Sequence, residues 1–347
     1  MTRRSIFFVA ALLACAFLVS TATPATAEDD RIRWKFATLA PDGVGWAKHV
    51  KKMIFPVIER ETEGRLETKI YWGGVMGDDE DYVKKMRVGQ LHGAGLSGQG
   101  VNIACPEMSV VELPFLFRNY DEVDHIKKKM RSQFDAILEE NGYMALSWLD
   151  QDFDQIYSAR YPMTETTHFE NARFMTWYGP IEEAVLERLG ANPVPINVPE
   201  ATTSVRQGVV DTVIGPAIYI VGAQMYTIVK YINPVKIRYS PALVLVTTDA
   251  YNMLPMKYHR RLEALREDLE RDFCALVRSD NAKCLQAMKR YGVTMVEMSD
   301  DQKRNFRARV RPVWEELAGD VYPRYILDEL IAHLEHYRRD KREIARQ

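Results

Sequence analysis

The residues with the clearest potential for chemistry are three aspartates that alternate along the chain, Asp150, Asp152 and Asp154. On a β-strand they would lie on one face, where three carboxylates could bind a cation or an amine. The next residue is Gln155 rather than the glycine of a calcium-binding loop. Two interpretations follow, a cation site and a solvent-exposed linker strand, and the pattern favours the exposed strand.

The sequence contains no motif of a known catalytic site. It has no nucleophile elbow, no zinc-protease helix motif, no P-loop and no dinucleotide-binding glycine pattern. Its seven histidines are scattered, and only His333 and His336 lie close together, on a charged terminal stretch where a solvated helix face is favoured over a metal site. We therefore expect no enzyme, no metal site and no cofactor.

Aromatic and methionine side chains are the remaining candidates for a binding site. The chain has 17 Tyr, 13 Phe, 6 Trp and 15 Met, and several of them fall at strand ends or in loops. Ligand pockets are mostly apolar, and in open α/β sheets they lie at the carboxyl ends of strands. The candidate ligand-binding residues of this kind are Trp46, Trp72, Met76, Phe115, Trp177 and Tyr219. For each of them, packing in the core is the competing interpretation.

The elements that must position these residues alternate between strand and helix, which predicts an α/β fold with largely parallel sheets. Residues 31–38 show the period-2 pattern of a strand, and residues 44–63 show helical spacing that ends at Gly64. A much longer helix is predicted from Pro255 to about Tyr291, closed by Gly292. At about 1.5 Å per residue it would exceed the width of one small domain, so we expect it to lie across two domains.

Composition and the N-terminal segment describe an exported globular protein. The 347 residues are 47% hydrophobic and carry a formal net charge of −2, which excludes a general nucleic-acid binder. Residues 1–27 combine Arg3 and Arg4, a short apolar run and a final Ala-Thr-Ala, the features of a signal peptide cleaved after Ala27. Cleavage removes two arginines and no acid, so the exported chain carries −4.

Three cysteines follow the predicted signal peptide, Cys105, Cys274 and Cys284. The last two lie ten residues apart on one predicted helix, about 15 Å, which is too far for a disulfide. At most one bridge, through Cys105, could form, and three free thiols are the favoured interpretation.

Several short motifs occur in a fixed order between about Trp34 and Leu254. They are residues 34–38 with Ala40-Pro41, residues 61–65 leading into 71–74, the Leu-Pro-Phe-Leu-Phe of 113–117, and residues 189–195 followed by 199–200 and 207–211. In this order they resemble the DctP-type solute-binding proteins of TRAP transporters.

The resemblance implies a periplasmic protein of two α/β domains, joined by crossing strands and braced by the long helix. It implies a cleft that closes on a small solute, usually an organic acid, and delivers it to a TRAP-type membrane permease without a chemical step. We place domain I at residues 28–151 with 240–285 and domain II at 152–239 with 286–318. Residues 319–347 are expected to form a C-terminal helical extension.

The chain departs from the family pattern where the ligand is held. The resemblance implies an arginine on the strand Arg173-Phe174-Met175, but its position falls on Met175. A second arginine position falls on Asp154, and a common asparagine position falls on Gly215. With these groups missing, we expect Met175→Arg to abolish binding of the native ligand or to shift specificity toward acids.

The departures leave several hypotheses. The first is a periplasmic TRAP-type protein that binds a neutral or apolar solute between aromatic and methionine side chains, with a helical-repeat accessory protein as a further partner. The second keeps a carboxylate ligand, held by Arg173, Gln99 and backbone amides. A secreted enzyme, and a sensor or assembly protein on the same fold, complete the set.

Overall fold

The structure, a computed structural model, describes residues 31–177 and 179–344. The signal peptide predicted at residues 1–27 and its cleavage site lie outside the described residues. Within the described ranges, no helix is both long and apolar enough to cross a bilayer.

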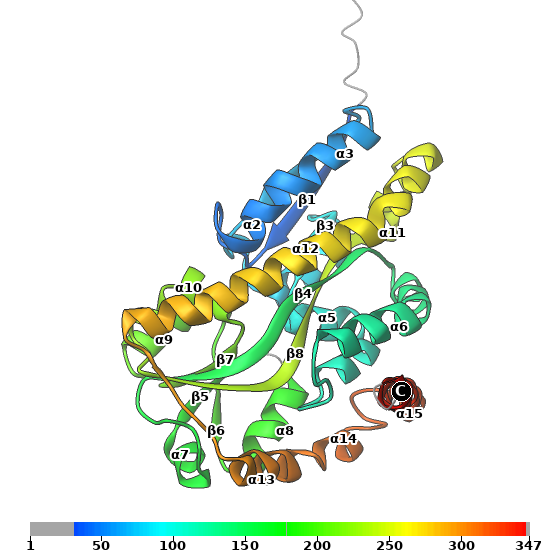
Figure 1. Ribbon diagram of the computed structural model, residues 1–347. Helices are drawn as coiled ribbons and strands as arrows, with labels where there is room; N and C mark the ends of the chain where they lie inside the picture. The colour runs from blue at the N-terminus through cyan, green and yellow to red at the C-terminus, as the bar shows by residue number, and fades with distance from the viewer. Residues whose placement is uncertain (1–30, 178, 345–347) are drawn as a thin grey trace, which may run out of the picture.

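One mixed sheet runs through the molecule in the order β2-β1-β3-β8-β4-β7-β5-β6, with β9 paired to β8 (Figure 1). The strands are β1 (Ile32–Thr38), β2 (Leu66–Tyr71), β3 (Gly93–Leu96), β4 (Tyr143–Ser158), β5 (Arg173–Thr176), β6 (Asn192–Pro195), β7 (Thr212–Gly215), β8 (Tyr231–Thr247) and β9 (Thr294–Met295). The first half of the sheet contains the parallel strands β2, β1 and β3, and the second half contains the parallel strands β7, β5 and β6. The predicted α/β architecture with crossing strands is confirmed.

The two halves are joined by β4 and β8, which pair antiparallel along nearly their whole length, from Tyr143 opposite Thr247 to Ser158 opposite Tyr231. Register shifts interrupt this ladder on both sides of Asp152, whose φ of 138° is unusual for a residue other than glycine. Every residue from Trp148 to Ser158 is buried. The prediction of an exposed linker strand is therefore wrong, because this strand lies between two packed layers.

The long helix α12 (Met256–Tyr291) has 36 residues and ends at Gly292, which takes the left-handed conformation with a φ of 110°. Figure 1 shows it running across the molecule beside both halves of the sheet. The amide of Asn281 on this helix donates to the backbone oxygen of Gln151 on β4, and its oxygen accepts the backbone N–H of Ile218 in the second half. The predicted bracing helix is confirmed.

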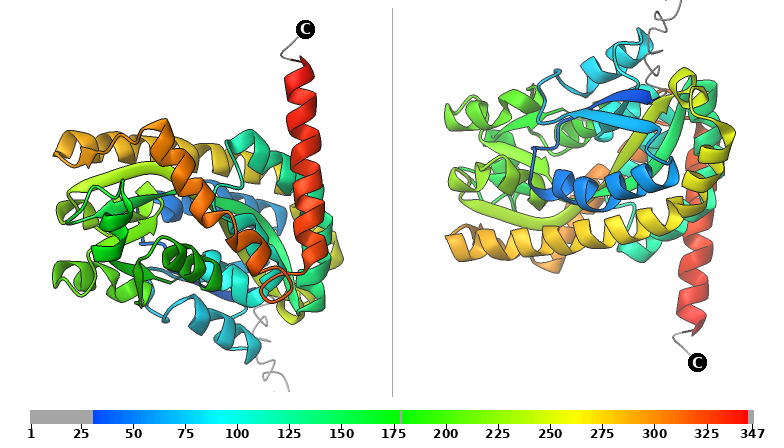
Figure 2. Two further views of the ribbon diagram at one scale, coloured as in Figure 1. Left: turned by 90° about the horizontal axis from the view of Figure 1, so that it is seen from below. Right: turned by 90° about the horizontal axis from the view of Figure 1, so that it is seen from above.

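A second helical segment lies beside α12 over the first half of the sheet (Figure 2, right). It consists of α2 (Gly45–His49), the π-helical turn η1 (Val50–Ile54) and α3 (Phe55–Glu61). A π-helical turn is rare and is frequently found at functional sites. Pro56 follows directly and has no N–H to donate to the preceding turn, which accounts for the irregular hydrogen bonding here.

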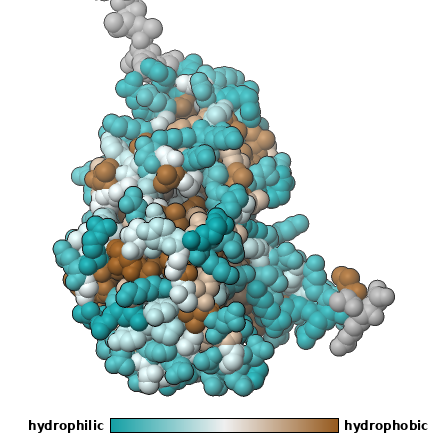
Figure 3. Space-filling view, turned by 60° about the vertical axis from the view of Figure 1, so that its left-hand side comes forward, coloured by the Kyte–Doolittle hydropathy of each residue, from teal (hydrophilic) through white to brown (hydrophobic). Residues whose placement is uncertain are grey.

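The other helices cover the remaining faces of the sheet. They are α4 (Asp79–Arg87), α5 (Gly98–Ala104), η2 (Pro106–Glu112), α6 (Tyr120–Glu140), α7 (Thr166–Asn171), α8 (Pro180–Arg188), η3 (Val198–Glu200), α9 (Ala201–Arg206), α10 (Ala217–Gly222), η4 (Met225–Thr227), α11 (Thr248–Asn252), α13 (Asp300–Val310), α14 (Val313–Glu316) and α15 (Arg324–Ile344). The first turns of α15 bury Ile326, Leu327 and Leu330 in the main core. Its last turns project from a mostly polar surface (Figure 3). The residue boundaries of the two domains stay a prediction.

The three cysteines of the described chain, Cys105, Cys274 and Cys284, are free thiols, as expected. Cys105 and Cys274 are buried, and Cys284 is partly buried.

Candidate functional site

An apolar cavity of about 250 Å³ lies between the first half of the sheet and the helices above it, and it opens where the two halves meet. An engineered cavity of about 150 Å³ with a similar lining stays dry and holds benzene. The lining from the sheet is Trp34, Phe36, Thr38, Leu66, Thr68, Ile70, Met144, Leu146, Leu149, Ala242 and Val244. The lining from the helices includes Trp46, Val50, Ile54, Val57, Ile58, Leu262, Arg266, Leu269 and Phe273. The cavity can therefore enclose an apolar molecule larger than benzene.

Four of the residues proposed from the sequence line this cavity together. Trp46 and Trp72 come from the first half, and Trp177 and Tyr219 come from the second half. The rings of Trp177 and Tyr219 stack with centroids 5.2 Å apart and planes 30° apart. The structure thus brings four of the five aromatic candidates to one cavity.

The positions at which arginines are expected in this family do not face the cavity. Met175 is only 1% exposed and belongs to the core of the second half. Arg173 stands at the start of β5, with its Nε 3.6 Å from Oδ2 of Asp211. Because β5 leads toward Trp177 at its other end, Arg173 lies about 13 Å of extended chain away from the cavity mouth. The structure therefore gives no support to Arg173 as the group that holds a carboxylate ligand.

Four further candidates also lie outside the cavity lining. Gly215 ends β7 and has no side chain to offer, and Gln99 begins α5 with a buried Oε1 that has no hydrogen-bond partner in the described chain. Met76 packs partly buried against the main core. Phe115 has a φ of 57° and lines a separate groove among arginine and lysine side chains. The periodicity of the sequence could not distinguish these four residues from the four aromatic residues that do line the cavity.

Sequence reasoning missed most of the polar residues of the lining, which include Thr38, Thr68, Ser97, Ser147, Gln151, Glu263 and Arg266. Ser97 begins a glycine-rich loop, which was a usable signal. Thr38 and Ser147 lie in or at the end of strands whose other residues have the pattern of a buried core. Their residue types alone gave no signal of a binding site.

A buried ionic network lies behind the cavity mouth. Nε of Arg238 on β8 donates to Oδ2 of Asp154 at 2.7 Å, and its Nη2 donates to Oε1 of Glu182 at 3.0 Å. All three side chains are buried. The second oxygen of Glu182 accepts the backbone N–H of Trp177 at 2.9 Å. The network therefore neutralises the charge of Arg238 with carboxylates of the protein itself. Through Glu182 it also holds the backbone of Trp177 in place.

Asp150, which also contributes to the lining, is neutralised in the same way. It accepts hydrogen bonds from Lys127 at 3.1 Å, from Arg278 at 2.7 Å and from the Tyr239 hydroxyl at 2.7 Å. Burial opposes ionisation, but Lys127 and Arg278 outweigh it and lower the pKa of Asp150 to about 2.

Asp152, the middle aspartate of the three, accepts a hydrogen bond from the Tyr120 hydroxyl. Burial raises the pKa of Asp152 to about 7. Each of the three aspartates therefore has partners of its own. In the described ranges, no group of three His, Cys, Asp or Glu side chains could hold a metal ion.

Three polar atoms in the lining have no hydrogen-bond partner in the described chain although they are buried. They are Nε1 of Trp46, the hydroxyl of Tyr219 and the hydroxyl of Thr68. A buried donor without a partner costs about 1–3 kcal/mol, so a bound molecule that accepts these bonds gains affinity. These groups are uncharged, and they suit a hydroxyl or carbonyl oxygen.

One hydrogen bond crosses from one half of the molecule to the other beside the cavity. Asp78 caps α4 and also accepts the backbone N–H of Val198 on its Oδ2 at 2.9 Å. Asp78 belongs to the first half and Val198 to the second, and Val198 lines the cavity mouth. The bond therefore holds the two halves closed at the mouth.

We expect Val198→Pro to weaken binding of the neutral fluorescent probe N-phenylnaphthylamine about tenfold. Proline removes only the N–H, which is worth about 1.5 kcal/mol when it donates to a carboxylate, and it fits the first position of η3 after the extended Asn197. Val198→Ala keeps the N–H and is the matched control. Equal affinities for wild type and Val198→Pro in a fluorescence titration would show that the bond does not contribute to closure.

Comparisons with known proteins agree with this architecture. The family model of the bacterial extracellular solute-binding proteins, family 7 (DctP), matches residues 36–320. The C4-dicarboxylate-binding periplasmic protein DctP of Rhodobacter capsulatus is 24% identical over 315 residues, which are 89% of this chain and 92% of that protein.

Solved structures share the fold. The sugar acid binding protein DctPAm of Advenella mimigardefordensis, in complex with galactonate, superposes with a TM-score of 0.82 at 19% identity over 88% of this chain and 98% of that one. A TRAP periplasmic solute-binding protein of Chromohalobacter salexigens, with bound D-glucuronate, gives 0.80 at 21% identity over 87% and 99%. The family match spans most of the described residues, from β1 to the turn before α15. The chain therefore belongs to family 7 of the bacterial extracellular solute-binding proteins, the DctP family of TRAP transporters, whose members bind solutes and are not enzymes.

Proposed function

We propose that this protein captures a neutral, largely apolar solute in the cavity at Trp46, Trp177 and Tyr219 and delivers it to a TRAP-type permease. The observation that carries the proposal is the charge of the lining. Among the described lining residues the only lysine or arginine is Arg266, which donates to Asp135 at 2.6 Å and to the backbone oxygen of Ala145 at 3.1 Å. The described lining therefore offers no unpaired lysine or arginine to a ligand carboxylate.

Electrostatics strengthens this argument. A carboxylate that leaves water for an apolar cavity loses its hydration, and it must recover that cost from a cation or from several hydrogen bonds. Arg238 and Arg278, the arginines of the neighbouring networks, already pair with Asp154 and Asp150. An apolar solute needs neither, and tryptophan and tyrosine rings offer large apolar contact surfaces.

The second candidate is binding of an organic acid. It is favoured by the relatives, since the solved structures above hold galactonate and glucuronate. In this chain the acid would have to be held by neutral donors such as Nε1 of Trp46 and the hydroxyl of Tyr219.

The proposed cellular setting follows from the family. We propose export to the periplasm by residues 1–27 with cleavage after Ala27, pairing with TRAP membrane permease subunits, and a helical-repeat accessory protein as a further partner.

A thermal-shift panel tests the solute class. We expect neutral apolar compounds to raise the melting temperature by about 5 °C when they are present at roughly a hundred times their dissociation constant. Sugar acids and short dicarboxylates should leave it unchanged. A panel in which only carboxylates stabilise the protein would overturn the proposal in favour of the second candidate. Native mass spectrometry of protein purified from its own host would identify the co-purifying solute.

A further inference from the structure

We infer that the solute is elongated, with a polar end at the cavity mouth and an alkyl chain that runs beneath the helical segment Val50–Glu61. We call this inner part of the cavity, between Ile58 and Leu146, the tail channel. The inference rests on the proposed function, because it concerns the same cavity and the same apolar solute. It adds the shape and orientation of that solute.

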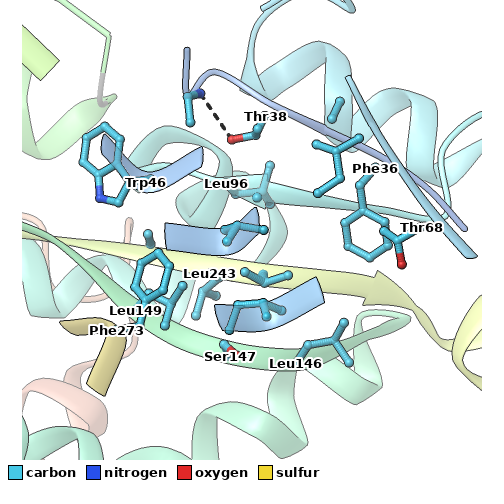
Figure 4. Close-up of a pocket in the computed structure, with 18 of the residues that line it drawn as sticks. Phe36, Thr38, Trp46, Thr68, Leu96, Leu146, Ser147, Leu149, Leu243 and Phe273 are labelled. Carbon is cyan, nitrogen blue, oxygen red and sulfur yellow. Dashed lines mark hydrogen bonds between the residues drawn. The ribbon is translucent and has the colours of Figure 1, made fainter. Parts of the chain in front are cut away.

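The cavity is long in one direction. On α12 its lining extends from Leu262 to Phe273, and eleven residues of α-helix span about 16 Å. Figure 4 shows Trp46 at one end of the pocket, and Phe36, Thr68 and Leu146 at the other end. A compact solute at the mouth would leave most of this length empty.

The apolar core on this face of the sheet is divided where the cavity lies. One cluster of buried residues gathers around Trp34, Phe36 and Tyr258, a second gathers around Leu149, Phe273 and Val277, and only the partly buried Val244 packs against both. An α/β layer normally packs without voids larger than a water molecule. A split core with an apolar gap is the arrangement expected when a ligand completes the packing.

The helical segment above the tail channel is seated loosely. Neither η1 nor α3 contains a single buried residue, although Ile54, Val57 and Ile58 point their apolar side chains at the cavity. The π-helical turn also weakens the regular hydrogen bonding of this segment. An alkyl chain in the channel would supply the apolar contacts that this helix lacks.

Polarity sets the orientation of the solute. At the far end two polar side chains are already paired, since the Tyr251 hydroxyl donates to Glu263 at 2.7 Å and Arg266 binds Asp135. At the mouth, Nε1 of Trp46 and the hydroxyl of Tyr219 have no partner in the described chain. Deeper in the lining, the hydroxyl of Thr68 is the one such group among the described residues. The polar end of the solute therefore belongs at the mouth.

The test uses the n-alkanols from butanol to dodecanol, which displace N-phenylnaphthylamine from the full-length exported protein. With wild type we expect the affinity to rise about fourfold for each added methylene, the factor given by burying one methylene group, until the channel is full. Leu146→Trp should stop the rise several methylenes earlier, and its loss of affinity should grow with chain length and reach at least 30-fold for dodecanol. Glu59→Trp, on the exposed side of α3, is the matched control and should follow wild type.

Each outcome separates the inference from the proposed function. Affinities that do not depend on chain length, or a Leu146→Trp curve that follows wild type, would overturn the tail channel while neutral solutes still bind. Binding of carboxylates but of no alkanol would overturn the proposed function as well. Ile58→Trp closes the channel from the helix side and replaces Leu146→Trp if that variant does not fold.

Discussion

Arg238→Met should lower the free energy of unfolding by about 3–5 kcal/mol, because it removes a buried cation that pairs with two buried carboxylates, Asp154 and Glu182. Breaking a buried ionic network by removing one partner leaves uncompensated charge in the interior. The Trp177 backbone, which Glu182 holds, should lose its fixed position in the same variant. Urea unfolding followed by tryptophan fluorescence measures both effects.

The loss should depend on pH in a defined direction. Burial already raises the pKa of Asp154 above its ordinary value in the wild type, and removing Arg238, which opposes that shift, raises it further. A carboxyl group whose folded-state pKa is raised binds protons more tightly in the folded chain, so stability falls as pH rises from about 4 through that pKa. Arg238→Met should therefore be less destabilised at pH 5 than at pH 8.

A triple variant with Arg238→Met, Asp154→Asn and Glu182→Gln provides the control. It removes the charges together and should recover much of the lost stability, since a buried pair replaced by neutral groups is often close to neutral in energy. If the urea midpoint of Arg238→Met equals that of the wild type at both pH values, the buried network does not contribute to the stability of the fold.

The sequence predicted the long helix and the order of elements well, for local physical reasons. The helix α12 begins after Pro255 and ends at Gly292, and both signals are local. The two crossing strands were predicted only in part. Pro234 and Pro241 interrupt β8, and three aspartates interrupt β4, so neither reads as a strand of 16 or 17 residues. Their polar residues are tolerated because partners distant in sequence, such as Arg238 for Asp154, neutralise them.

The candidate site was predicted less completely than the fold. Trp46 and Tyr219 were found because aromatic residues near strand ends are informative. Phe36 and Leu146 were not, because an apolar strand residue facing a cavity has the same pattern as one facing a packed helix. That difference arises from how closely the segment Val50–Glu61 approaches the sheet, which no local pattern records.

Met175→Arg is expected to lower the free energy of unfolding by about 3–5 kcal/mol and to create no carboxylate binding. The sequence alone predicts that this variant loses its native ligand or shifts specificity toward acids, but Met175 is 1% exposed and packs in the core of the second half with Tyr157 and Val213. A guanidinium there would be buried without a carboxylate partner of its own, since Glu182 is already bound to Arg238.

Met175→Leu is the matched control, because a swap of similar volume in a packed core should cost less than about 1.5 kcal/mol. Thermal melting of both variants, with and without galactonate and glucuronate, separates the two readings of this position. A Met175→Arg protein that melts like wild type and is stabilised by either sugar acid would place residue 175 in the binding site. An unstable Met175→Arg beside a stable Met175→Leu would instead show that residue 175 packs in the core, and it would leave the cavity on the other side of Trp177 as the solute site, where the one arginine of the described lining, Arg266, is already bound to Asp135.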